Sequence, residues 1–474
     1  MEARFGRRRC RLGAQPPRGP RRRRCPGGDG VDRISGLNDD LLIQVLVRLR
    51  CAGAAARTSL LSRRWRYLWR HLPELFFRDI APDALQAALA QVAIPKLSLL
   101  DIYAPLHFHI IMSVECIASL LHTAARLDPV EISIVARVSR SDELISVEVP
   151  SFARATSIRL HVGNLHLTLP AQGCEFPVLE RLSIASPRGR FDTGALISRC
   201  PKLRVLEIGE SLDTITVHSG TIEELLVTDG QLRGVDIVAP MLKKFTMRSS
   251  VHVDFTMSLL APKVENLLWK CWPVFGHLFP RVAIDGSEMW CLNRLELKTE
   301  EMVFILVLDI GRPYSATHMR NLQEMFQFPN ISVLELSVET RGHVYGAMAL
   351  NLLRICNAIR RLKLVIEHRM FGRMDDEVCP SDCPCNQPQG WRSQNISLTS
   401  LTELEIENFK GRGHEVDFLK LLFRCAPLMN VTLKLASKVV LSSRGCKETN
   451  SIFKANPTAE CHVYRKRGKE VIFT

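Results

Sequence analysis

Apolar residues recur along most of the chain in triplets that share one spacing, i, i+3 and i+5. The triplets begin at Ala155, Leu179, Leu203, Ile222, Leu242, Val264, Leu292, Ile331, Ile359, Leu401 and Leu428. The first five steps are 24, 24, 19, 20 and 22 residues, and later steps of 28, 39, 28, 42 and 27 residues indicate insertions. A short, nearly constant period predicts a solenoid in which each repeat adds one strand.

Proline precedes five of these triplets by two residues: Pro177, Pro201, Pro240, Pro262 and Pro329. Proline ends a preceding element and favours extended backbone in the residue before it, so each one leads the chain into a strand. The alternative is a run of unrelated strands in an ordinary sheet protein. Regular spacing and repeated lead-in prolines favour the solenoid.

Side chains alternate across a strand, so the residues between the buried triplet positions face outward together along a concave sheet. In the middle of this face, apolar Leu226 and Leu268 accompany basic Arg248 and Lys270. We expect an acidic, partly apolar segment of a target protein to bind there, because charge steers the encounter and apolar contacts hold it. The alternative is a solvated face with incidental charges. The candidate target-binding residues are Leu226, Arg248, Leu268, Lys270, Glu296 and Lys298.

Three short helices are predicted between residues 38 and 72. Asn38 is a favourable helix cap, and the apolar residues that follow it recur on one broad face. A second, alanine-rich helix spans 54–61, and a third, from Leu61, places Trp65 and Trp69 on one side and arginines on the other. So small a unit is mostly surface, so part of its apolar area must meet another chain or domain.

Residues Asp32 to Leu42 and Ala55 to Trp69 resemble the F-box of plant F-box proteins, without gaps. The family's Leu-Pro is Leu37-Asn38 here, which predicts weakened docking, since proline would preset the backbone at the helix entry. The resemblance implies binding to a Skp-type adaptor and through it to a cullin. The alternative is the core of an ordinary helical hairpin. The implied adaptor contacts, or their direct support, are Leu37, Asn38, Leu41, Leu42, Val45, Leu46, Leu49, Leu61 and Trp65.

The repeats resemble the degenerate leucine-rich repeats that follow the F-box in many plant proteins, and the strand, glycine-rich turn, helix and strand after Trp391 resemble the FBD-type domain. The expected fold is α/β: a short three-helix F-box, an irregular leucine-rich-repeat solenoid with its strands on the concave face, and an FBD-like α/β unit. The expected domains are a disordered arginine-rich tail (1–30), the F-box (31–78), the solenoid (79–378) and the FBD-like domain (379–474).

Three close cysteines, Cys379, Cys383 and Cys385, precede the FBD-like domain and raise the question of zinc, which prefers four ligands in a tetrahedron. His368, His414 or Cys425 could complete such a set through a fold contact. Paired CxxC spacing is absent, so we expect an ordinary loop of thiols, with no metal and no cofactor.

The net charge of +14 is concentrated near the N-terminus, because residues 1–30 contribute +8 and residues 32–78 contribute +5. The arginine-rich tail has no aromatic residue beside its two arginine runs to stack on bases, and its composition predicts disorder. The rest of the chain is electrically balanced. Nucleic-acid binding is therefore not expected.

Composition favours a non-enzymatic protein of the nucleus or the cytoplasm. The longest apolar run, Met302 to Leu308, is too short to span a membrane. Fifteen scattered cysteines fit buried thiols better than disulfides. The chain has no phosphate-binding glycine loop, HExxH or GxSxG motif, so no catalytic residue is predicted.

The resemblance implies the substrate-recognition subunit of an SCF-type ubiquitin ligase, which binds a target protein for ubiquitination while recruited enzymes perform the chemistry. Such a subunit contributes by holding the target close to the enzyme that transfers ubiquitin. An adaptor-bound scaffold or regulator that never delivers a substrate is the alternative. A small-molecule co-receptor is a third hypothesis, which the neutral charge of the repeats disfavours.

Overall fold

The structure is a computed structural model that describes residues 34, 36–104, 111–138, 145–163, 165–169, 176–185, 192–209, 214–273, 290–298, 301–310, 331–340, 342–367, 383–386, 389–437, 439–465, 468 and 470–471. The tail that was expected to be disordered, residues 1–30, lies outside them. The chain divides into two compact units. The N-terminal unit runs to Phe191 and includes Arg199–Lys202, and the C-terminal unit comprises Asp192–Ser198 and Leu203–Thr474.

The N-terminal unit begins with α1 (Asp39–Val47), α2 (Ala52–Arg57) and the 3-10 turn η1 (Thr58–Leu60). The third predicted helix is wrong as a continuous helix: turns follow Leu61, and only the 3-10 segment η2 (Leu68–His71) forms. Arginines spaced three and four residues apart repel one another on a helix. This applies to Arg63, Arg66 and Arg70. Their neighbour Arg64 is drawn back to the start of α1.

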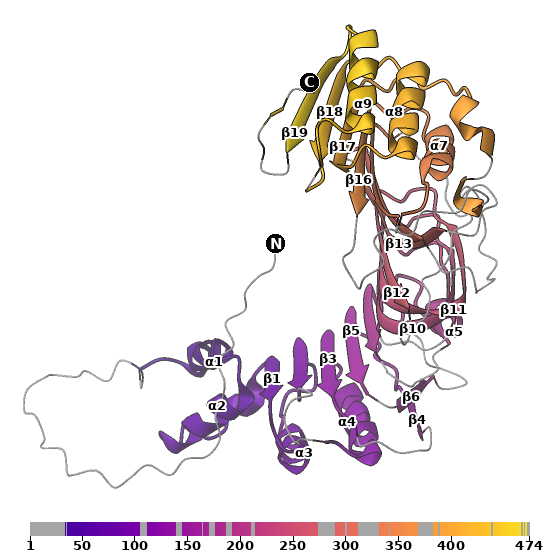
Figure 1. Ribbon diagram of the computed structural model, residues 1–474. Coiled ribbons are helices and arrows are strands. Elements are labelled where there is room, and N and C mark those ends of the chain that lie inside the picture. The colour runs from indigo at the N-terminus through magenta and orange to yellow at the C-terminus, as the bar shows by residue number, and fades with distance from the viewer. Residues whose placement is uncertain are drawn as a thin grey trace, which may run out of the picture. The chain divides into compact units, whose positions relative to one another are not determined.

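Parallel strands form the sheet of the N-terminal unit. In spatial order they are β1 (Glu74–Arg78), β2 (Leu99–Tyr103), β3 (Glu131–Ala136), β5 (Ser157–Val162) and β7 (Arg181–Ala185). Helices α3 (Pro82–Ala90) and α4 (Val114–Arg126) connect the first three strands (Figure 1). A short second layer pairs β4 (Ile145–Glu148) with β6 (Leu165–Thr168).

The repeats begin earlier than the triplets from residue 155 indicated. Leu72, Leu75 and Phe77 follow the same spacing and are buried at β1, and so do Leu97, Leu100 and Ile102 at β2. Strand β1 thus starts immediately after Pro73, inside the range expected for the F-box. The sheet pattern therefore adjoins the N-terminal helices without a linker.

The C-terminal unit opens with α5 (Thr193–Ser198) and a two-layered parallel section. Strand β10 (Glu224–Val238) pairs through its first half with β8 (Val205–Gly209) and through its second half with β9 (Thr214–His218). Strands β11 (Lys244–Leu260) and β12 (Asn266–Pro273) continue in parallel. Alternate residues of both halves of β10 are buried, so each half turns one face toward the core.

One antiparallel hairpin interrupts the parallel order. Strand β13 (Trp290–Lys298) pairs antiparallel with β12 and with β14 (Val303–Ile310), and parallel pairing then resumes at β15 (Val333–Glu339). The triplet at Leu292 is therefore reversed relative to its neighbours, with Leu297 beside Leu267. The regular strand order of the other repeats therefore does not extend to β13, which runs antiparallel to both of its neighbours.

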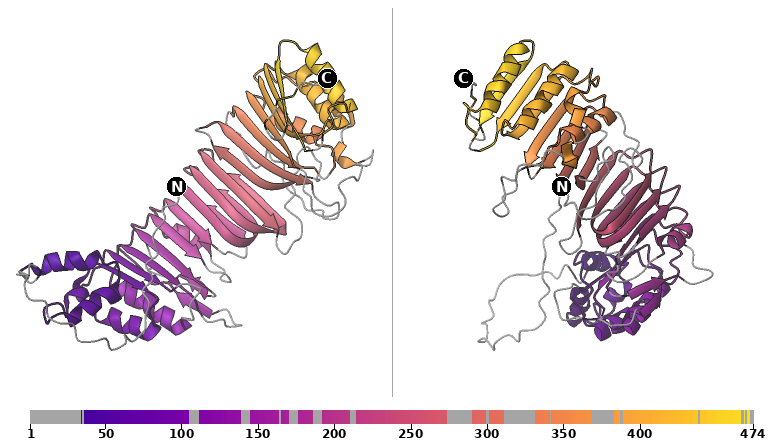
Figure 2. Two further views of the ribbon diagram at one scale, coloured as in Figure 1. Left: turned by 60° about the vertical axis from the view of Figure 1, so that its left-hand side comes forward. Right: turned by 45° about the vertical axis from the view of Figure 1, so that its right-hand side comes forward.

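The C-terminal end alternates strands with helices. Strands β15, β16 (Arg361–Glu367), β17 (Glu403–Phe409), β18 (Asn430–Leu435) and β19 (Glu460–Arg465) pair in parallel. Helices α7 (Gly346–Ile355), α8 (Gly413–Cys425) and α9 (Arg444–Ala455) connect them, with the 3-10 turns η4 (Pro384–Asn386) and η5 (Gln389–Ser393) before β17. Figures 1 and 2 show α8 and α9 against one face of these strands.

The triplet pattern corresponds to the core. Wherever the structure describes the side chains, the second and third triplet residues are buried, from Ile158 and Leu160 to Val431 and Leu433. The architecture is an α/β leucine-rich-repeat-like fold with helices at its N-terminal end. None of the described helices is long and apolar enough to cross a membrane.

Candidate functional site

The entry to α1 is held by side-chain hydrogen bonds. The Asn38 side chain caps the helix, since its Oδ1 accepts the Leu41 N–H at 2.9 Å. Arg64 donates to Asp39 at 2.8 Å and also to the Leu37 carbonyl. Cap and guanidinium together fix the direction of α1 against the turns that follow Leu61.

The apolar residues of α1 divide into two sets. Leu42 and Leu46 are 1% and 2% exposed and belong to the core. Leu41 and Val45 on α1, and Leu49 just after its end, are 43%, 47% and 44% exposed. A helix that buries one apolar stripe and exposes another has a second surface to cover, which is what a docking helix needs.

The remaining predicted adaptor contacts are distributed in the same way. Leu61 is 70% exposed, whereas Leu37 and Trp65 are half-buried. The sequence prediction missed three further exposed residues of this segment, Ile34, Leu60 and Tyr67. Their exposure depends on the turns that replace the third helix, so the sequence pattern alone could not have identified them. Residues 34–67 hold half of the large exposed hydrophobic side chains of the described residues.

The predicted target-binding residues lie in rows across the outward face of β10 to β13. Sheet register places Leu226 beside Thr246, Thr246 beside Leu268, and Leu268 beside Glu296. The leucines are half-buried, since their neighbours on adjacent strands cover part of each side chain. The face therefore combines side chains from four consecutive strands.

A second row contains the cations of this face. Arg248 pairs with Lys270, and Lys270 pairs with Arg294. Lys298, another predicted target-binding residue, lies outside this row: β13 runs antiparallel, so Lys298 lies opposite Asn266 and Arg294 stands beside Lys270. The basic row thus consists of Arg248, Lys270 and Arg294, and its third member was missed because strand direction leaves no mark on an alternating pattern.

Two of these cations have no acidic partner. Within the part of the chain that the structure describes, neither Arg248 nor Lys270 forms an ion pair, and both are exposed. Glu296, by contrast, contacts Arg294 and lies 3.7 Å from the Lys298 Nζ. We call the row of Leu226 and Leu268 together with Arg248 and Lys270 the central patch.

Comparison with known proteins identifies the N-terminal helices. Residues 34–77 match the F-box domain family. The chain contains an F-box domain. An F-box/LRR-repeat protein of Arabidopsis thaliana is 28% identical over 437 residues, which cover 87% of this chain and 89% of the relative.

Two more Arabidopsis relatives extend the likeness. An F-box/FBD/LRR-repeat protein is 28% identical over 464 residues, covering 90% of this chain and 89% of its own length. An FBD-associated F-box protein is 29% identical over 216 residues, covering 41% of this chain and 48% of the relative. The resemblance to plant F-box proteins with leucine-rich repeats and an FBD region is confirmed, and it extends over most of the chain.

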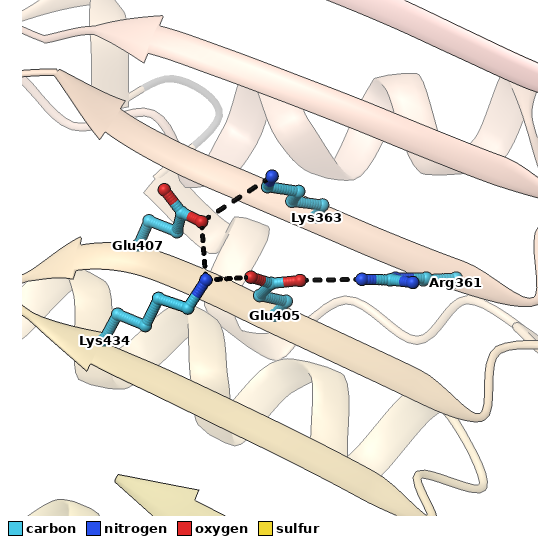
Figure 3. Close-up of polar contacts among 5 residues, drawn as sticks. All are labelled: Arg361, Lys363, Glu405, Glu407 and Lys434. Atoms are coloured by element: carbon cyan, nitrogen blue, oxygen red, sulfur yellow. Dashed lines mark hydrogen bonds and ion pairs between the residues drawn. The ribbon is translucent and has the colours of Figure 1, made fainter. Parts of the chain in front are cut away.

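Beyond the F-box domain, the outward face of β16 to β18 carries charges that neutralise one another. Glu405 accepts hydrogen bonds from Arg361 at 2.8 Å and from Lys434 at 2.6 Å, and Lys434 also bonds Glu407 at 2.9 Å (Figure 3). The Lys363 Nζ lies 3.6 Å from Glu407. We call these five residues the charge ladder. It occupies the sheet face opposite α8 and α9.

The charge ladder shifts the pKa of its central carboxylate. Burial alone would raise the pKa of Glu405, but hydrogen bonds from Lys434 and Arg361 outweigh it and lower the pKa to about 2. The same contacts, led by the bond to Glu405, raise the pKa of Lys434. These charges are already paired within the sheet, so they have less to offer a partner than the central patch.

The cysteine-rich lead-in is brought to a residue that the sequence prediction missed. Cys383 and Cys385 lie with His343, and the three ligand atoms are all within 4.8 Å of one another. Cys379 and His368 lie outside the described residues. His414 instead stacks edge-on against Tyr345, and the Cys425 Sγ faces the Gln394 carbonyl at 4.0 Å. His343 is 40 residues from Cys383, so no local spacing could have identified it.

Proposed function

We propose that this F-box protein is the substrate-recognition subunit of an SCF-type ubiquitin ligase. Its exposed apolar residues on α1 bind a Skp-type adaptor and through it a cullin, and its outward sheet face binds the target protein. It supplies no catalytic residue, because the enzymes that the cullin recruits perform the ubiquitin transfer. A place in the nucleus or the cytoplasm, where such ligases act, follows from this role.

One observation carries the proposal: α1 secures its own packing with Leu42 and Leu46 and still exposes Leu41 and Val45, with Leu49 exposed just beyond its end. Apolar side chains that the fold does not need, on a domain that matches the F-box, are the expected anchors of an interface. The central patch supports the second half of the proposal, since its cations have no acidic partner among the described residues.

The test is the affinity of the full chain for a purified plant Skp-type adaptor, measured by calorimetry. Val45→Glu places a charge in the proposed interface, and we expect at least tenfold weaker binding, about 1.4 kcal/mol. Val440→Glu is the matched control, because Val440 is 64% exposed and lies in the C-terminal unit. It should bind the adaptor like the unaltered protein.

Equal affinity of the Val45→Glu protein and the control would overturn the assignment of the interface. Target delivery needs a second measurement, in which proteins that co-purify with the chain are quantified with and without a proteasome inhibitor. Accumulation of bound, ubiquitinated partners supports the ligase role. Adaptor binding without any such accumulation would favour the scaffold alternative.

A further inference from the structure

Two thiols and an imidazole converge beside the start of α7. Cys383 and Cys385 flank Pro384 in the segment around η4, and His343 lies in the connection between β15 and α7. Both cysteines are buried, and His343 is half-buried. Among the described residues no other group of three such side chains brings its ligand atoms so close together.

The spacing of the ligand atoms suits a tetrahedral metal ion. With bonds of about 2.3 Å to sulfur and about 2.0 Å to nitrogen, neighbouring ligands of zinc lie about 3.5 to 3.8 Å apart. The Cys383 Sγ is 3.3 Å from the His343 Nδ1, and all three atoms fall within 4.8 Å. Small movements of the three side chains would place every ligand atom at bonding distance from one central ion.

The backbone around the cluster is arranged as it is around thiolate ligands. The Val344 N–H donates to the Cys385 Sγ at 3.4 Å, and the Asn386 N–H closes a turn by donating to the Cys383 carbonyl at 3.0 Å. An amide that points at sulfur stabilises a thiolate and orients it, as groups around a metal site do. This hydrogen bond is an observation independent of the three ligand atoms.

We infer that His343, Cys383 and Cys385 bind one zinc ion. A nitrogen and two sulfurs form a donor set that selects zinc over magnesium or calcium. Two thiolates and a neutral imidazole balance the charge of Zn²⁺, so the loaded site can stay mostly buried. A water molecule or a further side chain would complete the four ligands.

The site would act as a structural staple. Asn386, one residue after Cys385, accepts hydrogen bonds through its Oδ1 from the Trp391 Nε1 at 3.1 Å and from Arg392 at 2.9 Å. Trp391 is fully buried against α7, where a Cβ added to Gly346 would lie 2.2 Å from its ring. Zinc would therefore join the β15–α7 connection to the segment that sets this tryptophan in place.

The test begins with the metal content of the full chain, purified without chelator and measured by mass spectrometry. We expect one zinc per chain, lost in the double variant Cys383→Ser and Cys385→Ser. Cys446→Ser is the control, since Cys446 is equally buried in α9, far from the cluster in the sequence. Replacing zinc by cobalt should produce the visible bands of a tetrahedral site with thiolate-to-cobalt charge transfer.

A second measurement uses the unaltered protein, so it does not depend on whether the variants fold. Alkylation of individual cysteines of the unaltered protein is followed with and without a chelator, and we expect Cys383 and Cys385 to react more than tenfold faster once zinc is removed. Cys446 reports on general unfolding and should not change. Absence of zinc and of a cobalt spectrum, zinc that persists in the double variant, or alkylation that ignores the chelator would each overturn the inference.

Discussion

Helices α1 and α8 differ in how completely their apolar side chains are buried. In α8, Phe418, Leu419 and Leu422 are fully buried, and no large apolar side chain is exposed. In α1, Leu42 and Leu46 are buried, whereas Leu41 and Val45 are left exposed. Helix α8 is thus covered by its own unit, whereas α1 keeps an uncovered apolar surface, which the proposed adaptor would cover.

The charged residues of the sheet differ between two regions in a similar way. The charge ladder pairs acids with bases on β16 to β18, and the central patch leaves Arg248 and Lys270 without acidic partners among the described residues. Charges that are already paired within the sheet have less to offer a partner. Exposed, unpaired cations beside apolar residues are what a target with acidic side chains would recognise.

The largest expected effect concerns the core of the C-terminal unit. Trp391→Ala removes a fully buried indole that packs against α7, so we expect a loss of about 3 to 5 kcal/mol of unfolding free energy in the C-terminal unit. Leu61→Ala, in the F-box domain, removes a side chain that is 70% exposed and should change stability by less than about 0.5 kcal/mol. Denaturant unfolding followed by circular dichroism measures both.

If Leu61→Ala destabilised the chain as much as Trp391→Ala, the contrast between the two regions would be wrong. Leu61 would then be a core residue that is only incompletely covered. Equal and small effects of both substitutions would instead show that the tryptophan is not an anchor of the C-terminal unit.

The sequence was sufficient for the features that depend on local periodicity. Buried triplet residues such as Leu206 and Leu404 were predicted because alternation fixes which side of a strand faces the core. Strand direction was not predictable, since β13 buries Leu295 and Leu297 equally well in either direction. Turns replaced the third F-box helix because Arg64 bonds to the start of α1, a contact that local propensity does not include.

The candidate sites also contain features that the sequence predicts and features that only the fold reveals. From the sequence, one broad apolar face was predicted for the helix after Asn38, and the structure has such a helix at α1. The sequence did not separate Leu42 from Leu41, since that requires knowing what packs against the helix. His343 came to Cys383 only through the pairing of β15 with β16 and the path of the chain between them, so it could be found only in the fold.

A smaller effect tests the charge ladder. Glu405→Gln should lower stability at neutral pH by about 1 to 3 kcal/mol, because charged hydrogen bonds from Lys434 and Arg361 lose their acceptor charge. Glu403→Gln is the control on the same strand, since Glu403 has a longer contact, 4.0 Å to Arg360. Unfolding measured across pH separates the two.

The contribution of Glu405 to the free energy of unfolding should decrease at low pH. The pKa of Glu405 is lowered from 4.5 to about 2 in the folded protein, so the folded state holds fewer protons between these values. Its contribution is complete above pH 4.5 and is lost as the pH falls toward 2. The difference between the unaltered protein and Glu405→Gln should shrink over that interval. A difference that stays constant down to pH 2 would contradict the ladder.

The smallest effect concerns the entrance of α1. Asn38 has φ −72° and ψ 165°, a backbone conformation that proline also adopts, and its side chain caps the helix. Asn38→Ala removes the cap and should weaken adaptor binding, through loss of about 1 kcal/mol of helix stability. Asn38→Pro exchanges the cap for a preset backbone, so its adaptor affinity should equal or exceed that of the unaltered protein. Calorimetry with the Skp-type adaptor ranks the three proteins, and a proline variant weaker than the alanine variant would show that α1 depends on the Asn38 side chain itself.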